Sequence, residues 1–306
     1  MKILITGASG FIGRNYLLRS KFANEFNTCI YYQSKTFPDW LEKHKKNDTV
    51  HKLDLTNRPE IESILQKDQE YDVCLYLAAN GDPAFSFKFP LEDLCKNTVS
   101  VINICNHIKI KKFIYFSSGA VYDGINGYVN PTVKLNPILP YSISKLASEF
   151  YLSYFKSIKR LGNFSIVRFF GAYGPYEAER KIYGNLVRQF GIKKESDFTI
   201  KGDGKNLIDA MYINDTIGAI DNLIEDPSPP EIFDLTLGNP LTITQLVIQS
   251  AKVFNIKPKI SYEGSVPEYI KFVSNDTSYQ RRYGKVGKTS LEEGLLLFNK
   301  FLAEDN

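Results

Sequence analysis

Residues 2–13 read KILITGASGFIG, an apolar run followed at once by glycines in the spacing G-x-x-G-x-x-G. Such a run predicts a buried strand, and the glycines predict a tight turn into a helix that begins at Phe11 and Ile12. In this arrangement Gly7 permits the turn, Gly10 lets the backbone approach a pyrophosphate, and Gly13 lets the helix pack close to the sheet. Free N–H groups at the helix start bind the anion. The stretch therefore predicts a dinucleotide site.

The chain continues with an alternation of apolar and amphipathic segments. Several of the apolar runs are continuous, as expected for strands buried on both faces of a sheet. Alternating strands and helices predict a doubly wound parallel sheet, the Rossmann architecture of the α/β class. The expected strands are residues 2–6, 28–33, 50–53, 72–77, 112–117 and 164–168, and the expected helices are 11–20, 38–46, 58–67, 91–108 and 141–159.

This alternation ends near residue 171, after which turn-rich stretches separate less regular segments. We therefore expect a dinucleotide-binding Rossmann domain over residues 1–170. Residues 171–306 are expected to form mainly a smaller, mixed C-terminal lobe that binds substrate, with elements at about 206–240 returning to the first domain. Helices are expected at 242–254 and 290–303.

Composition excludes several classes of function. The 306 residues carry a net charge of only +4, without a long run of one sign, so no nucleic-acid partner is expected. The four cysteines form no CxxC, and the three histidines lack metal-ligand spacing, so no metal site is expected. The sequence shows no signal peptide and no apolar stretch long enough for a bilayer. We expect a cytoplasmic protein without a membrane partner.

Residues at the ends of the expected strands complete the cofactor site. Asp54 and Leu55 end the third strand, where a carboxylate can reach the adenine amine. Ala78 and Ala79 end the fourth, where small side chains leave room for ribose and phosphates. Strict NAD sites usually carry an acid at the end of the second strand to bind the ribose 2′-hydroxyl. Here that place holds no carboxylate, which predicts NAD(P) with NADP favoured; the residues are Gln33, Ser34 and Lys35.

Three further residues suit hydride chemistry. Ser118 closes the fifth strand, at the sheet edge where open α/β folds hold ligands. Tyr141 and Lys145 lie four apart on an expected helix and share one face. A phenol is a poor base at neutral pH, but a nearby ammonium favours the phenolate. Ser118 can hydrogen-bond a substrate oxygen, and Lys145 can also bind the cofactor ribose.

In this order, these motifs make the chain resemble the extended branch of the short-chain dehydrogenase/reductase superfamily, within its NAD(P)-dependent nucleotide-sugar epimerase/dehydratase family. The resemblance runs almost end to end. It implies that Leu77, Asn97, Tyr141 and Lys145 also contact the cofactor. It further implies a homodimer that pairs through a four-helix bundle, formed here by residues 91–108 and 141–159.

Departures from the family pattern narrow the implied reaction. Gly119 and Ala120 stand where dehydratases and decarboxylases of the family carry carboxylates, so those activities are not expected. What remains is chemistry at sugar C4. The resemblance thus implies a C4 epimerase or a 4-keto-sugar reductase acting on a nucleotide sugar, in the synthesis of surface polysaccharide precursors.

The substrate lobe leaves an alternative open. Asn185 and Leu186 match a nucleotide-contacting segment of the family, but Ile208 and Val266 replace the arginines that usually hold the diphosphate. An apolar side chain cannot replace a guanidinium, so Lys205 is a candidate substitute. The alternative is a reductase of a carbonyl substrate without a nucleotide. A third hypothesis is a non-catalytic protein that senses NADP(H).

Overall fold

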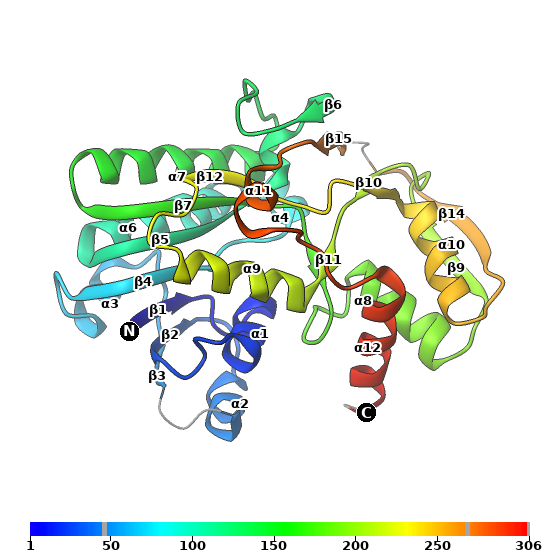
Figure 1. Cartoon of the computed structure of the whole chain (residues 1–306), viewed down its shortest axis with the longest axis horizontal. Coiled ribbons are helices and arrows are strands. Elements are labelled where there is room, and N and C mark those ends of the chain that lie inside the picture. Colours follow the sequence, from blue (N-terminus) through cyan, green and yellow to red (C-terminus); the bar gives the residue numbers. More distant parts are fainter. Residues whose placement is uncertain (45–47, 267–269, 305–306) are drawn as a thin grey trace.

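A seven-stranded, fully parallel sheet forms the centre of the computed structural model, which describes residues 1–44, 48–266 and 270–304 (Figure 1). Its strand order is β12-β7-β5-β4-β1-β2-β3. The order reverses between β1 and β4, and this reversal places the cofactor loop at the switch point of the sheet. The strands are β1 (Lys2–Thr6), β2 (Phe26–Tyr31), β3 (Thr49–Lys52), β4 (Glu70–Tyr76), β5 (Lys109–Ser118), β7 (Leu161–Phe169) and β12 (Ile232–Leu235).

Helices cover both faces of this sheet, as the doubly wound fold requires. Alternate residues of a strand point to opposite faces. Accordingly, Ile3 and Ile5 of β1 pack in the same core cluster as α1 (Phe11–Arg19), α2 (Phe37–His44) and α9 (Ile213–Glu225). The other face carries Leu4 in a second cluster, with residues from α3 (Arg58–Ile64), α6 (Ser100–His107) and α7 (Pro140–Ser157). The fold class expected from the sequence is confirmed.

Shorter elements extend from the carboxyl edge of the sheet. Between β4 and α6 lie α4 (Pro83–Lys88), α5 (Pro90–Leu94) and a π-helical turn η1 (Cys95–Val99), so the expected helix 91–108 is divided. A 3-10 turn η2 (Gly119–Tyr122) follows β5. The expected helix 38–46 is observed as α2, and its last residues lie outside the described part of the chain.

Small two-stranded sheets join the C-terminal elements to one another and to the central domain. The pairs are β6 (Asn126–Val129) with β15 (Lys271–Ser274), β8 (Ala172–Tyr173) with β11 (Met211–Tyr212), β9 (Asp197–Lys201) with β14 (Lys259–Glu263), and β10 (Leu207–Ile208) with β13 (Leu241–Thr242). The remaining helices are α8 (Ile182–Leu186), a π-helical η3 (Val187–Ile192), α10 (Ile243–Val253), α11 (Ser278–Tyr283) and α12 (Leu291–Glu304). α8, α10 and α12 lie to one side of the central sheet, at the right in Figure 1.

A buried ion pair ties the sheet to the helix that carries the expected catalytic residues. Arg168 of β7 donates from Nη2 to Glu149 Oε2 of α7 at 2.8 Å and from Nε to Glu149 Oε1 at 3.2 Å. Both side chains are about 95% buried, at 4% and 5% exposure. Ser117 also donates to Glu149, and Tyr122 accepts from Arg168. Because every charge is paired and hydrogen-bonded, this pair is the kind that tolerates burial.

Within the described residues, none of the helices is both long and apolar enough to cross a bilayer. The same residues contain no cluster of histidine, cysteine or carboxylate side chains arranged to hold a metal ion.

Candidate active site

The glycine turn has the geometry that its spacing predicts. Gly7 adopts a φ of +67°, and a Cβ at that position would lie 2.8 Å from the backbone nitrogen of Ala78. A Cβ on Gly13 would lie 2.5 Å from the carbonyl oxygen of Ala8, so only glycine lets α1 start this close to the turn. Gly10 donates its N–H to Gly7 O at 2.9 Å and caps the helix. The turn is therefore a backbone cradle of the kind that holds phosphates.

A cavity of about 700 Å³ opens beside this turn at the carboxyl ends of β1 to β4. Its size and its backbone cradle suit a dinucleotide. The predicted cofactor residues that line it are Gly7, Gly10, Gln33, Asp54, Leu55, Leu77, Ala78 and Ala79.

Other predicted cofactor residues do not line this cavity. Phe11, Ile12 and Gly13 form the first turn of α1. Ser34 and Lys35 follow β2 but lie outside the lining, where Tyr31 and Tyr32 stand with Gln33. β2 ends at Tyr31, two residues before the end predicted from the sequence, because Tyr32 and Gln33 are equally compatible with a continuing strand. The negative charge of Asp54 raises the pKa of the Tyr32 phenol.

The prediction for Asn97 requires a correction. Its side chain is fully buried, and its carboxamide is occupied by protein groups. Nδ2 donates to Asp93 Oδ1 at 3.0 Å and to Ser144 Oγ at 2.9 Å, while Oδ1 accepts the N–H of Asn80 at 2.8 Å. Asn97 does not line the cofactor cavity. In this structure it holds the loop after β4 against α7.

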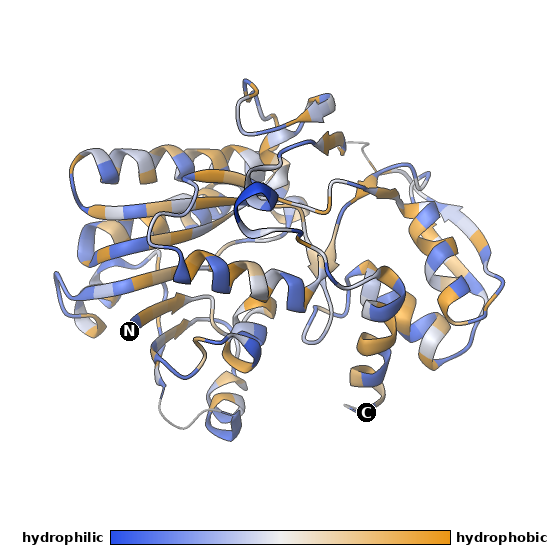
Figure 2. Ribbon diagram, viewed as in Figure 1, coloured by the Kyte–Doolittle hydropathy of each residue, from blue (hydrophilic) through white to orange (hydrophobic). Residues whose placement is uncertain are grey.

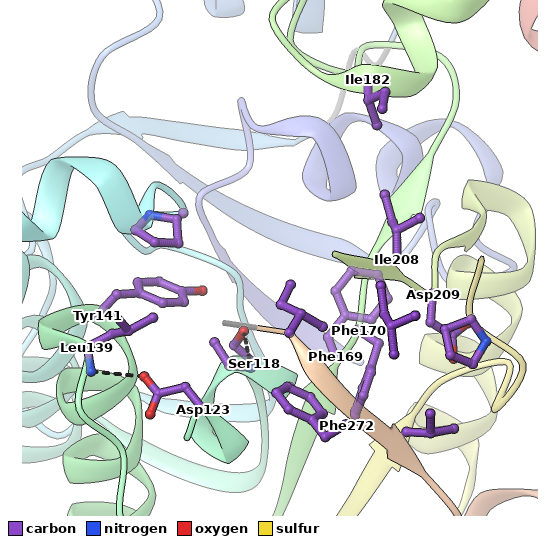
Figure 3. Close-up of a pocket in the computed structure, with 18 of the residues that line it drawn as sticks. Ser118, Asp123, Leu139, Tyr141, Phe169, Phe170, Ile182, Ile208, Asp209 and Phe272 are labelled. Carbon is purple, nitrogen blue, oxygen red and sulfur yellow. Dashed lines mark hydrogen bonds between the residues drawn. The ribbon is translucent and has the colours of Figure 1, made fainter. Parts of the chain in front are cut away.

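Ser118 and Tyr141 meet at a second cavity, of about 400 Å³. Ser118 comes from the end of β5 and Tyr141 from the first turn of α7. Figure 3 shows the hydroxyl end of Tyr141 directed toward Ser118, and both residues line this cavity. Gly81 lines both cavities, so the Ser118–Tyr141 pair lies next to the cofactor cavity.

Lys145 lies one turn beyond Tyr141 on the same buried face of α7 and is only 3% exposed. Its Nζ donates to the carbonyl oxygen of Phe116 at 2.7 Å and lies 4.9 Å from the ring of Tyr115. Burial lowers the pKa of Lys145 to about 8, although the carboxylates of Asp93 and Glu149 oppose this change. The ammonium is therefore close to its titration range at neutral pH.

Burial and two neighbouring side chains act on the pKa of Tyr141. Burial raises the pKa of the phenol, the hydrogen bond from Ser118 lowers it, and the charge of Asp93 raises it. In this structure the Nζ of Lys145 donates to Phe116 O. The action of the Lys145 ammonium on Tyr141 stays a prediction.

Two contacts fix the start of α7 and hence Tyr141. The buried carboxylate of Asp123 accepts the N–H groups of Ile138 at 2.7 Å and Leu139 at 2.9 Å, the latter bond being visible in Figure 3. Ser86 Oγ accepts the N–H of Tyr141 at 3.1 Å. These side chains satisfy helix-start donors that would otherwise lack partners. Neither Asp123 nor Ser86 was identified from the sequence, since a lone Asp or Ser in a loop carries no distinctive signal.

The wall opposite Tyr141 is mostly apolar. Phe169, Phe170, Ile208 and Phe272 line it, as Figure 3 shows. Ile208, which stands where the family usually carries an arginine, therefore faces the cavity. The one cationic side chain in the lining, among the residues described, is Lys181.

The predicted substrate residues of the C-terminal lobe lie elsewhere. Leu186 is fully buried in the core, so its side chain cannot contact a bound molecule in this conformation. Asn185 is exposed on α8 but does not line the cavity. Lys205 also lies outside the lining, and its Nζ pairs with Asp203 at 3.0 Å. Val266 packs beside Gly202. Of the predicted substrate contacts, Ser118 alone faces the cavity.

Comparison with known proteins agrees with this geometry. Residues 3–235 match the model of the NAD dependent epimerase/dehydratase family. The chain is 30% identical over 276 residues to the dTDP-D-glucose 4,6-dehydratase of Dictyostelium discoideum, covering 83% of this chain and 62% of that protein. It is 28% identical over 244 residues to Protein CapI of Staphylococcus aureus, covering 75% of this chain and 71% of that protein.

Solved structures share the fold. The UDP-glucose 4-epimerase of Thermotoga maritima, solved with UDP-glucose, superposes with a TM-score of 0.84 at 23% identity, covering 100% of this chain and 99% of that chain. The UDP-glucuronic acid 4-epimerase of Bacillus cereus, in complex with UDP-glucuronic acid and NAD, gives 0.84 at 22% identity with full coverage of both chains. Together with the glycine cradle and the Ser118–Tyr141 pair, the family match over residues 3–235 identifies this chain as a member of the NAD dependent epimerase/dehydratase family, an NAD-dependent enzyme of the nucleotide-sugar epimerase/dehydratase type.

Proposed function

We propose that this enzyme transfers hydride at C4 of a nucleotide sugar, either as a C4 epimerase or as a 4-keto-sugar reductase in the synthesis of surface polysaccharide precursors. The observation that carries the proposal is the Ser118–Tyr141 pair, which faces a cavity adjoining the cofactor cavity at Gly81. A proton and a hydride leave a secondary alcohol from neighbouring atoms, so the base and the cofactor must share one wall of the site. NAD(P), when bound, supplies the hydride acceptor or donor.

Three residues of the chain are assigned to proton transfer and charge stabilisation. Tyr141 takes the proton from the substrate hydroxyl, or returns it in reduction. Ser118 donates a hydrogen bond to the same oxygen and stabilises the charge that develops there. Lys145, through its buried ammonium, provides the positive charge that favours the phenolate once its Nζ turns from Phe116 O toward the cofactor side.

The carboxylates that line the cavity near Ser118 argue against a dehydratase reaction. Gly119 and Ala120 follow Ser118 without a carboxylate, and the ring of Phe170 packs within 3.0 Å of where a Cβ on Gly119 would lie. The cavity does contain Asp123 and Asp209, but Asp123 is bound to backbone N–H groups. Asp209 likewise accepts from Thr236, Leu237 and Gly238. Among the described residues of the lining, no carboxylate is free to act as the acid or base of a dehydratase.

Product analysis tests the reaction directly. Purified enzyme is incubated with UDP-glucose or dTDP-glucose and catalytic NAD, and separately with a 4-keto sugar nucleotide and NADPH. Conversion to the C4 epimer without net change of cofactor supports the epimerase, and stoichiometric oxidation of NADPH supports the reductase. Accumulation of a 4-keto-6-deoxy sugar would show dehydratase activity and contradict the proposal.

The apolar wall formed by Phe169, Phe170, Ile208 and Phe272 favours a second candidate, a reductase of a carbonyl substrate without a nucleotide. Lys181 supplies the one cation that the described lining offers a diphosphate. Calorimetry with UDP, GDP, CDP and dTDP separates the candidates, since a sugar-nucleotide enzyme binds at least one of them. Absence of binding by all four, with NADPH oxidation on a simple ketone, would establish the second candidate. Hydride transfer to either substrate class rules out a purely NADP(H)-sensing role.

For the cofactor we propose NADP in preference to NAD. Tyr31, Tyr32 and Gln33 line the cavity at the end of β2, and none of them offers a carboxylate to a ribose 2′-hydroxyl. The variant Gln33→Asp should lower the ratio of NADPH to NADH affinity by about tenfold, because a carboxylate repels a 2′-phosphate and binds a hydroxyl. Fluorescence titration of both cofactors measures this ratio. Lys35→Ala is the matched control, and a larger effect there than at position 33 would contradict the placement.

We also propose that two copies of the chain pair through α5 and α7. Apolar side chains that are strongly exposed gather on these helices and on the neighbouring α4: Phe87, Phe89, Leu91, Leu94, Ile143, Phe150, Tyr151 and Tyr154. Figure 2 shows apolar residues distributed along α7, at the edge of the molecule. Such a contiguous patch is typical of a homodimer interface.

A charge in this patch should separate the copies. Phe150 is 68% exposed, so Phe150→Glu is expected to leave the fold intact and to shift the mass measured by light scattering from about twice 34.9 kDa to the monomer value. Phe26→Glu, at a residue 76% exposed on β2, should leave the mass unchanged. A wild-type protein that is already monomeric at high concentration would refute the pairing.

A further inference from the structure

We propose that Asp93 is a positioning residue of the reaction: its buried carboxylate fixes the turn of α7 that carries Tyr141 and Lys145, and it acts as the fixed countercharge of Lys145. The inference rests on the proposed function, because it concerns the residues assigned there to proton transfer. It adds a group outside both cavity linings, since Asp93 contacts neither space.

The carboxylate of Asp93 joins three segments of the active site. It is fully buried on α5. Oδ1 accepts from Asn80 Nδ2 at 2.6 Å and from Asn97 Nδ2 at 3.0 Å, and Oδ2 accepts from Ser144 Oγ at 2.6 Å. Asn80 belongs to the loop that leads to Gly81, Asn97 to η1 and Ser144 to α7. One carboxylate thus links the boundary between the two cavities to the helix that carries the catalytic pair.

Ser144 transmits this link to the backbone of the catalytic turn. It lies between Tyr141 and Lys145 on α7, and its Oγ is also 2.9 Å from the carbonyl oxygen of Tyr141. The carbonyl oxygen of Ser144 in turn accepts from Thr98 Oγ1 at 2.8 Å. Fully satisfied buried polar networks of this kind restrict a segment to one position. The network therefore limits rotation of the turn that aims Tyr141 at Ser118.

The donors to Asp93 are all neutral. Three hydrogen bonds hold the buried carboxylate in place. Within the described residues, Asp93 has no salt-bridge partner, whereas Glu149, the other carboxylate that acts on Lys145, is paired with Arg168. The charge of Glu149 is thus largely compensated, and the charge of Asp93 is not. The remaining groups around the ammonium are Phe116 O and the ring of Tyr115, which carry no net charge.

The charge of Asp93 favours the ammonium of Lys145 and does not favour the phenolate of Tyr141. Burial lowers the pKa of Lys145 to about 8, and Asp93 is the larger of the two charges that oppose this change. For Tyr141 the same charge raises the pKa, so Asp93 does not activate the phenol directly. Asp93 therefore counteracts the effect of burial on Lys145, the residue assigned above to favour the phenolate once its Nζ turns from Phe116 O.

The variant Asp93→Asn removes the charge and can keep the network. An amide oxygen can accept from Asn80 and Asn97, and an amide nitrogen can donate to Ser144 Oγ, whose hydroxyl proton is then free to be donated to Tyr141 O. In protein labelled at the lysine Cε carbons, NMR follows the titration of Lys145, and Lys145→Arg assigns its signal. The expected result is a titration midpoint at lower pH than in the wild type, with the upper pH limit of turnover lowered in parallel.

Asp234→Asn is the matched control. Asp234 is also buried and also accepts from neutral donors, namely Tyr122 Oη and Ser274 Oγ, but it is not among the charges that act on Lys145. An unchanged Lys145 midpoint in Asp93→Asn, with a loss of stability similar to that of the control, would show a merely structural role and overturn the proposal.

Ser144→Ala tests the positioning role and covers the case in which Asp93→Asn does not fold. It cuts the link to α7 and leaves the charge, so turnover should fall about tenfold while the Lys145 midpoint stays in place. Unchanged turnover would overturn the positioning role. The NMR titration needs no substrate. Absence of both C4 epimerisation and reduction of a 4-keto sugar nucleotide therefore counts against the proposed function, and an unmoved midpoint counts against Asp93.

Discussion

Replacing Tyr141 with phenylalanine is expected to lower turnover by about a thousandfold while cofactor affinity stays within about twofold. The substitution removes one oxygen atom and keeps the ring, which is 8% exposed and packed at the start of α7. General acid–base groups contribute roughly a hundred to ten thousandfold, and the Tyr141 hydroxyl is directed toward Ser118 in this structure. The variant should therefore bind both ligands and fail only in proton transfer.

Stopped-flow measurement of hydride transfer and fluorescence titration of cofactor separate these two effects. Ser118→Ala serves as the comparison and should lose less, about tenfold to a hundredfold, because it removes a hydrogen bond and leaves the base. Tyr141→Phe with turnover within tenfold of the wild type would refute the assignment of Tyr141 as the base. An equal loss of cofactor binding would instead indicate a structural role.

Replacing Arg168 with methionine should destabilise the fold by about 3–5 kcal/mol, the largest stability effect expected for a single substitution here. The change leaves Glu149 as a buried carboxylate without a cation, at 5% exposure. Ser117 would remain as a hydrogen-bond donor to Glu149, but a single neutral donor does not replace a bidentate guanidinium. The damage should spread to α7, since Glu149 lies on that helix.

Urea unfolding followed by circular dichroism measures this loss. The double variant Arg168→Met with Glu149→Gln is the diagnostic comparison, because it removes both charges and should recover a large part of the lost stability. No recovery in the double variant would mean that Arg168 stabilises the fold by packing and not by its pairing with Glu149. Lys156→Met, at an exposed ion pair with Glu231, should cost less than about 1 kcal/mol.

The central fold follows from local patterns in the sequence, and local patterns also place Ser118 and Tyr141 at one cavity. The run 2–13 determines a strand, a turn and a helix without help from distant residues. Ser118 and Tyr141 follow from a strand end and from a helical spacing. Each of these features depends on a few residues that are close together in the sequence, and the structure confirms the predicted fold class.

What the sequence does not predict depends on tertiary contacts. The roles of Asp93 and Asp123 become visible only when α5, η2 and α7 are brought together, because their partners lie far away in the chain. Leu186 fits a motif by spacing, but the fold buries its side chain in the core. Lys145 was expected to act on Tyr141, and in this structure its Nζ donates to a carbonyl oxygen on β5. In each case a contact distant in sequence decides the outcome.

The last strand of the central sheet, β12, comes from residues Ile232–Leu235, long after the catalytic residues in the chain. During synthesis on a ribosome, β7 is therefore expected to remain an unpaired edge strand of the sheet until β12 has been made. Unpaired edges recruit strands from other molecules. A fragment that ends near residue 170 should aggregate when expressed alone, and chaperones should engage the nascent chain until about 235 residues have left the exit tunnel.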